Sequence, residues 1–283
     1  MVRNALLLLG AIKFEHTLFA LPFALLSAFV AAGGVPSTWT LGWILVAMVA
    51  ARSSAMAVNR LADLRYDREN PRTASWPLAA GLLGVGAMWA FAVSCALLLV
   101  FAAAMLNRLA LFLSPLALLI VWGYSYAKRF TSLCHFLLGL SLAVAPVGAW
   151  VAVRAEMGFP ALVLGLAVLL WTAGFDIIYA TQDIDFDRAQ RLPSAPCRMG
   201  VKGALLLSAG VHAAAFALLI WFMVLARLGS TFLLGLGIAA VMLVYQHAIV
   251  RPTDLSRVNA AFFTANGVVS VALFVFGALD IYR

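Results

Sequence analysis

The stretch AAGLLGVGAMWAFAVSCALLLVFAAA, residues 79–104, runs for 26 residues without a charged side chain. About 20 mostly apolar residues are enough for an α-helix to cross the hydrocarbon core of a bilayer. A strand of a membrane barrel would instead alternate apolar and polar residues with a period of two, and this stretch shows no such alternation. It therefore predicts a membrane-spanning helix that is long enough to tilt.

Eight more stretches of this kind lie on either side of it, at residues 14–33, 40–58, 108–126, 133–153, 159–182, 203–226, 230–250 and 258–282. Of the 283 residues, 65% are hydrophobic and 11% are charged, and the mean hydropathy is +1.04. About a quarter of the residues in a soluble domain are charged. The predicted fold is all-α, a polytopic membrane bundle of nine transmembrane helices. No long linker interrupts the chain, so residues 1–283 are expected to form a single domain.

The cationic side chains predict the orientation of this bundle. With the N-terminus in the cytoplasm, 14 of the 19 Lys and Arg residues fall on the inner side: Arg3, Lys13, Arg60, Arg65, Arg68, Arg72, Lys128, Arg129, Arg188, Arg191, Arg198, Lys202, Arg251 and Arg257. Only four fall outside, which is the bias that the positive-inside rule describes. The net charge of +8 is therefore a topology signal, and no nucleic-acid partner is expected. The bacterial inner membrane is the expected location.

The acidic residues are concentrated in two places. Seven of the eleven lie close to NRLADLRYD, residues 59–67, or to YATQDIDFD, residues 179–187, both on the predicted cytoplasmic side. Each stretch places polar side chains four residues apart, and residues four apart lie on one face of a helix. The first predicted ridge is Asn59, Asp63 and Asp67. The second is Tyr179, Asp183 and Asp187, which Asp176 joins from two turns earlier.

Carboxylates stacked four residues apart repel one another unless a cation compensates them. Mg²⁺ is the natural candidate, because it prefers oxygen ligands and is commonly held by one or two carboxylates together with substrate phosphates. The predicted metal ligands are Asn59, Asp63, Asp67, Asp183 and Asp187. The alternative is two solvated loops whose charges are balanced by nearby arginines. The repetition of the spacing on one face argues against that alternative.

These motifs resemble a known family. NRLADLRYDRENPRT (residues 59–73) and DIIYATQDIDFDR (residues 176–188) are similar to the two aspartate-rich motifs of the UbiA superfamily of intramembrane aromatic prenyltransferases. KFEHTLFALPFAL, YSYAKRFT and RLPSAPCRMG resemble its quinone-biosynthesis branch, the 4-hydroxybenzoate polyprenyltransferase-like proteins, and within it the members of the futalosine route to menaquinone. The resemblance implies nine helices and Mg²⁺-dependent transfer of a polyprenyl group from polyprenyl diphosphate to a small aromatic acid, 4-hydroxybenzoate or a hydroxynaphthoate.

The resemblance also implies roles for individual residues. Asn59, Asp63 and Asp67 match the first motif, Asp183 and Asp187 match the second, and Asp176 and Tyr179 match its lead-in. Lys128, Arg129 and Arg72 match positions that contact diphosphate. One departure is visible, because Trp76 of RTASWPL stands where many relatives have an arginine. That departure weakens any expectation about the phosphate contacts of this loop.

Four other cations are candidates for substrate binding. Arg52 lies seven residues before Asn59 and therefore about 10 Å deeper in the same helix. It is expected to pair with an aspartate or with the carboxylate of an acceptor, although an ion pair between helices would explain it equally well. Arg198 and Lys202 are either diphosphate contacts or surface cations that set the topology. Lys13, which follows a predicted interfacial helix at residues 2–12, is a candidate for the acceptor pocket.

Two other functions remain open. A UbiA-type enzyme for another acceptor, such as heme, chlorophyllide or a tocopherol precursor, would share the metal site. A small-molecule membrane transporter would also carry polar residues, but more often at the bilayer midplane and in two related halves. The expected partners are the two substrates and the lipid bilayer, and the sequence gives no sign of an obligate protein partner.

Overall fold

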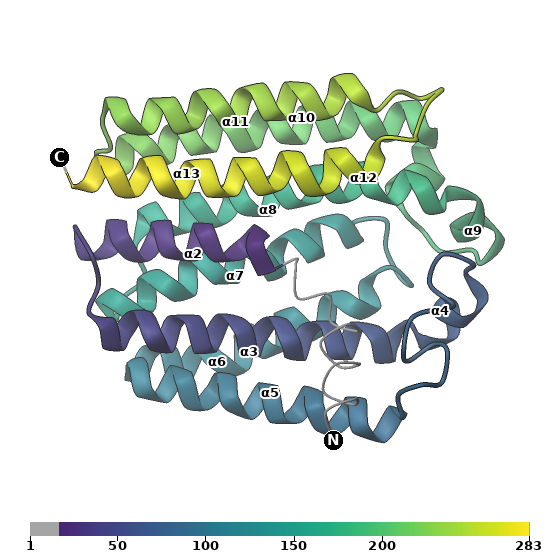
Figure 1. Ribbon diagram of the computed structural model, residues 1–283, viewed down its shortest axis with the longest axis horizontal. Coiled ribbons are helices and arrows are strands. Elements are labelled where there is room, and N and C mark those ends of the chain that lie inside the picture. Colours follow the sequence, from purple (N-terminus) through teal and green to yellow (C-terminus); the bar gives the residue numbers. More distant parts are fainter. Residues whose placement is uncertain (1–16, 283) are drawn as a thin grey trace.

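The computed structural model describes residues 17–282, which form helices and no β-strand (Figure 1). Eight helical segments are long and apolar enough to cross a membrane. They are α3 (Thr38–Ala62), α5 (Val85–Leu106), α6 (Arg108–Ala127), α7 (Cys134–Arg154), α8 (Phe159–Ala180), α10 (Ala195–Leu225), α11 (Ser230–Ile249) and the segment from α12 (Val258–Ala260) to α13 (Asn266–Ile281). The predicted all-α membrane bundle is confirmed.

The ninth predicted span corresponds to α2 (Thr17–Ala32), an apolar helix of 16 residues that starts where the described part of the chain starts. The count of nine and the cytoplasmic N-terminus therefore stay predictions. Lys13 and the predicted interfacial helix at residues 2–12 lie outside the described residues.

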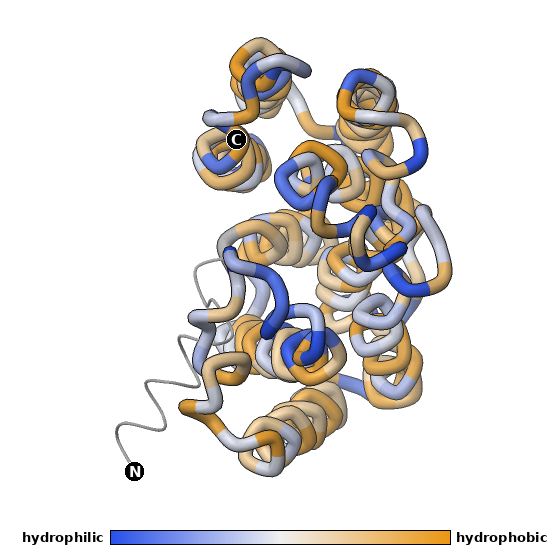
Figure 2. Tube along the Cα trace, turned by 90° about the vertical axis from the view of Figure 1, so that its right-hand side faces the viewer, coloured by the Kyte–Doolittle hydropathy of each residue, from blue (hydrophilic) through white to orange (hydrophobic). Residues whose placement is uncertain are grey.

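The polar segments gather at one end of the bundle. The short helices α4 (Leu64–Glu69) and α9 (Ile184–Ala189) lie together at the end opposite the C-terminus (Figure 1). Gln190 joins them by donating from Nε2 to Oε2 of Glu69 at 2.7 Å. Seen from this end, hydrophilic residues occupy the connecting segments, whereas the helices behind them are mostly hydrophobic (Figure 2). The fold thus collects both acidic stretches on one face.

Small residues allow α8 to pack closely between α7 and α10. A Cβ atom on Gly139 of α7 would lie 2.2 Å from the backbone oxygen of Leu169 on α8. A Cβ atom on Gly174 of α8 would lie 2.4 Å from the ring of His212 on α10. Membrane helices gain most of their association energy from such close contact, because lipid tails are as apolar as the side chains.

Gly139→Ala is expected to destabilise the bundle. The added methyl group meets backbone rather than a movable side chain, so α7 and α8 must separate, at a cost of about 1–3 kcal/mol. Thermal unfolding in detergent should show a lower Tm. Gly148→Ala, on the same helix but with nothing within 4 Å of its Cβ position, is the matched control. Equal Tm values for the two variants would contradict this account of the packing.

Two helices begin or continue differently from the prediction. Helix α5 begins at Val85 rather than residue 79, because the preceding residues form a loop in which Gly81 has a φ of +74°. The last span contains a π-helical turn, Ala261–Ala265, where Nδ2 of Asn266 donates to the carbonyl oxygen of Phe262 at 2.8 Å. The loop before α5 matters for function because it forms part of the pocket described next.

Candidate active site

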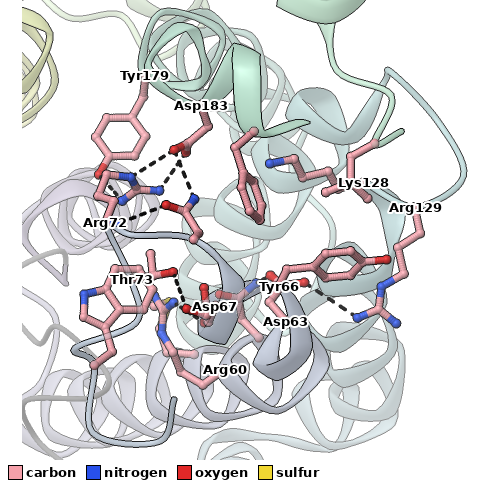
Figure 3. Close-up of a pocket in the computed structure, with 16 residues that line it drawn as sticks. Arg60, Asp63, Tyr66, Asp67, Arg72, Thr73, Lys128, Arg129, Tyr179 and Asp183 are labelled. Carbon is pink, nitrogen blue, oxygen red and sulfur yellow. Dashed lines mark hydrogen bonds and ion pairs between the residues drawn. The ribbon is translucent and has the colours of Figure 1, made fainter. Parts of the chain in front are cut away.

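A pocket of about 210 Å³ opens at the end of the bundle where the acidic stretches meet (Figure 3). It is lined by the end of α3, by α4 and its following loop, by the loop after α6, and by the end of α8 with α9. The lining residues are Met56, Asn59, Arg60, Asp63, Tyr66, Asp67, Asn70, Arg72, Thr73, Trp76, Lys128, Arg129, Tyr179, Asp183, Phe186 and Leu192. The two motifs are therefore parts of one site.

The first motif spans the junction between α3 and α4. Helix α3 ends at Ala62, and Asp63 stands between the two helices with a φ of −88° and a ψ of 5°. The hydrogen bonds from residue to residue four positions earlier continue through this junction, so the expected spacing is kept although the helix is interrupted. Asn59 donates from Nδ2 to Oδ2 of Asp63 at 3.1 Å.

The second motif is likewise divided, between α8, a 3₁₀ turn (Thr181–Asp183) and α9. Tyr179 and Asp183 line the pocket, and Asp187 lies beside it with no exposed surface. Asp176 is placed elsewhere: its Oδ2 lies 2.7 Å from Nδ1 of His135, and it is not part of the pocket lining. The predicted ridge thus separates into two environments.

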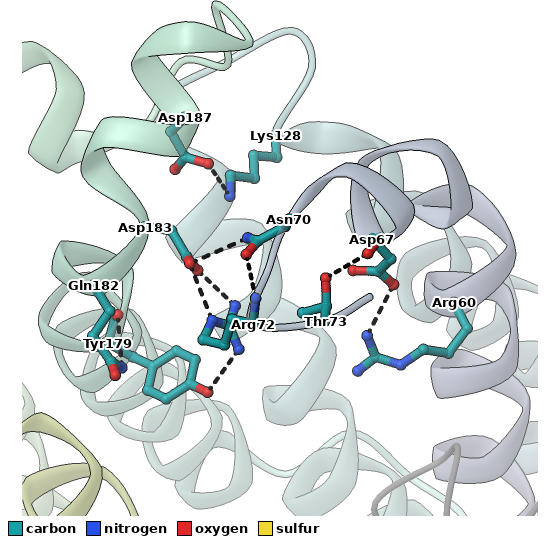
Figure 4. Close-up of polar contacts among 10 residues, drawn as sticks. All are labelled: Arg60, Asp67, Asn70, Arg72, Thr73, Lys128, Tyr179, Gln182, Asp183 and Asp187. Carbon is teal, nitrogen blue, oxygen red and sulfur yellow. Dashed lines mark hydrogen bonds and ion pairs between the residues drawn. The ribbon is translucent and has the colours of Figure 1, made fainter. Parts of the chain in front are cut away.

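Each of the four central aspartates is paired with a basic side chain (Figure 4). The ion pairs are Arg60–Asp67 at 3.3 Å, Arg72–Asp183 at 2.7 Å, Lys128–Asp187 at 2.7 Å and Arg129–Asp63 at 3.7 Å. Arg129 also donates to the carbonyl oxygen of Ala62 at the end of α3. This arrangement neutralises the carboxylate repulsion that the sequence alone left uncompensated.

Arg72 ties the loop after α4 to α8. Its Nε and Nη2 atoms donate to the two oxygens of Asp183 at 3.1 and 2.7 Å, and its Nη1 donates to the hydroxyl of Tyr179 at 3.3 Å. Asn70 adds a weaker bond to Asp183 at 3.4 Å. A forked contact of this kind fixes orientation as well as charge, so Arg72 holds the two motifs together across the pocket.

Several pocket residues were not predicted as site residues from the sequence: Arg60, Tyr66, Asn70, Thr73 and Trp76. Arg60 is 8% exposed, and its guanidinium lies 3.8 Å from the ring centroid of Trp76. The seven-residue spacing between Arg60 and Asp67 corresponds to two helical turns and was the available signal. Trp76, the departure from the family pattern, packs against an arginine here.

The predicted substrate-binding cations divide into three groups. Lys128, Arg129 and Arg72 line the pocket. Arg52 lies within α3 and outside the pocket lining, and its Nε is buried without a hydrogen bond to any described residue. Arg198 is exposed to solvent and takes no part in the lining, which favours the surface-cation alternative for this residue.

Burial changes the acidity of the pocket groups. Burial, with a further contribution from the charge of Asp67, raises the pKa of Asp63 from its usual 3.8 to about 6. Burial also raises the pKa of Asp67, although Arg60 opposes the shift. Burial disfavours the charged form of Lys128, but Asp187 outweighs this effect and the pKa of Lys128 is raised. Lys128 is therefore a firmly charged cation beside the pocket.

The donor set fits Mg²⁺ in its chemistry. All the predicted ligands offer carboxylate or amide oxygens, which are the ligands that Mg²⁺ prefers. Among the described residues, however, no three acidic, histidine or cysteine side chains are grouped closely enough to share an ion. The ion pairs account for this spacing, because each carboxylate is drawn toward its own basic partner. Metal binding would require those partners to move away.

These features define an integral membrane protein with a pocket that combines carboxylates and fixed cations, which suits a phosphate ligand and a divalent metal. Residues 20–268 match the UbiA prenyltransferase family. The chain therefore belongs to this family, as its motifs predicted, and it is a prenyltransferase.

Two relatives are 4-hydroxybenzoate octaprenyltransferases. The protein from Xanthomonas campestris pv. campestris is 32% identical over 248 residues, which cover 87% of this chain and 81% of the relative. The protein from Cupriavidus necator is 33% identical over 252 residues, covering 87% and 86%.

Solved structures agree with the fold. A UbiA homologue from Aeropyrum pernix K1, in its apo form, superimposes with a TM-score of 0.81 and 34% identity over 95% of this chain and 98% of that one. A UbiA homologue from Archaeoglobus fulgidus bound to GPP and Mg²⁺ gives a TM-score of 0.72 over 98% and 100% of the two chains. At 19% identity, the second likeness supports the fold alone.

Proposed function

We propose that this enzyme transfers a polyprenyl group from polyprenyl diphosphate to a small aromatic acid, 4-hydroxybenzoate or a hydroxynaphthoate, in ubiquinone or menaquinone biosynthesis. The whole chain, residues 1–283, acts as one domain in the bacterial inner membrane with its pocket toward the cytoplasm. The observation that carries the proposal is the pocket, where two aspartate stretches and four basic side chains meet at the end of an apolar bundle. The names of the relatives support the aromatic acceptor.

Mg²⁺ would be held by Asn59, Asp63, Asp67, Asp183 and Asp187. When bound, it supplies positive charge that stabilises the diphosphate leaving group as the allylic carbon–oxygen bond breaks. Lys128, Arg129 and Arg72 act as fixed donors to the same diphosphate. Because these cations pair with the aspartates in the absence of substrate, they exchange carboxylate partners for phosphate oxygens when the substrate binds.

The allyl fragment and the acceptor ring lie on the apolar side of the pocket. Exclusion of water there protects the allyl cation from hydrolysis. The aromatic rings of Tyr66, Tyr179 and Trp76 line the pocket, and aromatic faces attract cations. Arg52, about 10 Å deeper than Asn59, is the group that receives the carboxylate of the acceptor, because a cation inside the membrane requires a partner.

The direct test is an assay of the purified protein in detergent with labelled polyprenyl diphosphates, Mg²⁺ and a panel of aromatic acids. Formation of a prenylated acid supports the proposal. Heme, chlorophyllide and a tocopherol precursor belong in the same panel. Prenylation of one of these alone, or movement of a solute across vesicles without any product, would overturn the proposal.

Arg52→Gln is expected to raise the KM for the aromatic acid by about 10- to 100-fold, because a hydrogen bond to a charged group contributes about 1.5–3 kcal/mol. The KM for polyprenyl diphosphate should stay near the wild-type value. The methyl ester of the acid, which has no negative charge, serves as the control acceptor and should be used equally well by both proteins. An unchanged KM for the acid would exclude this role for Arg52.

The apparent affinity for Mg²⁺ is expected to fall as the pH is lowered through about 6. The raised pKa of Asp63 means that this carboxylate gains a proton, and loses its charge, in a range where an ordinary aspartate stays ionised. Mg²⁺ titrations at constant ionic strength between about pH 7.5 and about pH 5 measure the effect. Asp63→Asn should bind Mg²⁺ weakly at every pH and lack the step. A step of the same size in that variant would assign the titration to another group.

A further inference from the structure

His135 joins three helices at the cytoplasmic end of the predicted topology. It is the second residue of α7, and its side chain is 3% exposed. Its Nδ1 lies 2.7 Å from Oδ2 of Asp176 on α8. Its Nε2 accepts a hydrogen bond of 3.3 Å from the backbone amide of Ala195, the first residue of α10. Both ring nitrogens are therefore used.

The amide of Ala195 determines where the imidazole carries its proton. A backbone N–H can only donate, so Nε2 must present a lone pair, and the proton of the neutral ring lies on Nδ1. Nδ1–H then donates to Oδ2 of Asp176. A doubly protonated ring would direct an N–H at the amide of Ala195 and lose that bond. The geometry thus favours a neutral His135 that donates to an ionised Asp176.

Asp176 differs from the other four motif aspartates. Each of those is paired with Lys or Arg, whereas the printed ion pairs of the described chain give Asp176 only His135. Its side chain is 23% exposed, although its neighbours Phe175 and Ile177 are 3% and 0% exposed. A carboxylate that is held by a neutral donor on one oxygen retains capacity to accept on the other.

The position of Asp176 along α8 indicates what this carboxylate faces. Tyr179 and Asp183, three and seven residues later, line the pocket, and residues at these spacings share a helix face. Asp176 therefore lies on the pocket side of α8, about 10 Å below Asp183. Arg52 stands in the same relation to Asn59, seven residues earlier in α3. The two residues flank one depth of the bundle from two different helices.

We propose that His135 is a positioning residue, which holds Asp176 so that its second oxygen accepts a hydrogen bond from the hydroxyl group of the aromatic acceptor. This inference rests on the proposed function, because it requires an aromatic acid with a ring hydroxyl. Arg52 receives the carboxylate of that acid and Asp176 its hydroxyl, so an acid with the two groups across the ring from each other is selected. The hydrogen bond also increases the electron density of the ring that attacks the allyl cation.

Two amide substitutions separate the two bonds of His135. The amide nitrogen of His135→Asn replaces Nδ1 and can still donate to Asp176. The longer side chain of His135→Gln reaches the position of Nε2, where its oxygen can accept from Ala195 while the bond to Asp176 is lost. His135→Gln is expected to raise the KM for 4-hydroxybenzoate at least about tenfold and to leave the KM for polyprenyl diphosphate unchanged. His135→Asn should restore most of the loss.

Unsubstituted benzoate, which has no hydroxyl, is the matched ligand control. Its inhibition constant should be the same for wild type and for His135→Gln, because Asp176 has nothing to accept from it. If His135→Gln fails to fold, as judged by its Tm, Asp176→Asn provides the second variant, with the same selective loss for the hydroxylated acid.

The possible results distinguish the inference from the function on which it rests. A wild-type protein that prenylates no aromatic acid overturns the proposed function. An active wild type with any of three results overturns the inference alone: His135→Gln weakens both substrates equally, benzoate inhibition weakens as much as 4-hydroxybenzoate binding, or His135→Asn gives no recovery.

Discussion

Asp183→Ala is expected to reduce kcat/KM for prenyl transfer by about 10³-fold or more. Asp183 is a proposed metal ligand, and a lost electrostatic contact to a developing charge costs about 10²- to 10³-fold on its own. The substitution also removes both carboxylate contacts of Arg72, so the loop after α4 is released from α8. Two effects on the same pocket should therefore combine.

The measurement is single-turnover prenyl transfer at saturating Mg²⁺, with Tm recorded for each variant. Asp185→Ala is the matched control, because Asp185 lies two residues away but is exposed and outside the pocket lining. Activity within a few-fold of wild type is expected for this control. Retention of more than about a tenth of the activity by Asp183→Ala would remove Asp183 from the proposed metal site.

Lys128→Met is expected to raise the KM for polyprenyl diphosphate and to lower kcat/KM by about 10²-fold, because a charge-assisted donor to the leaving group is lost. It should also lower the Tm, since Asp187 has no exposed surface and its contact with Lys128 is 2.7 Å. A buried charge without its partner is strongly destabilising. The partial exposure of Lys128, 37%, makes this stability effect smaller than for a fully buried pair.

The double variant Lys128→Met/Asp187→Asn separates the two effects. Removal of both charges should restore the Tm, whereas the donor to the diphosphate stays absent and activity stays low. Arg198→Met tests whether any basic residue on this side would matter, and it should be close to wild type because Arg198 is exposed and away from the pocket. Recovery of activity in the double variant would show that Lys128 acts only as the counter-charge of Asp187.

The helical membrane fold was predictable from hydropathy, because each spanning helix must satisfy its own backbone in lipid and leaves a long apolar stretch in the sequence. Helix boundaries were less predictable. Residues 79–84 are as apolar as the rest of their stretch, yet they belong to the loop before α5. Apolar character reports burial or contact with lipid, and it does not report where the backbone leaves the helix.

The candidate site was predictable in its residues and less so in its pairing. Spacing placed Asn59, Asp63 and Asp67 together because bonds between residues four apart persist through the break at Asp63. The same reasoning placed Asp176 with Asp183, and the structure instead gives Asp176 to His135. A helix repeat identifies neighbours on one helix only, so it could not indicate a partner on α7.

The sequence by itself determined the membrane class, the two aspartate stretches and the family, since these depend on composition and on spacing within single segments. Only the tertiary structure decided that Arg60, Arg72, Lys128 and Arg129 each neutralise one aspartate, and that Trp76 packs on Arg60. The physical reason is that an ion pair depends on distance in space, and the partners here come mostly from segments that are brought together only when the bundle closes.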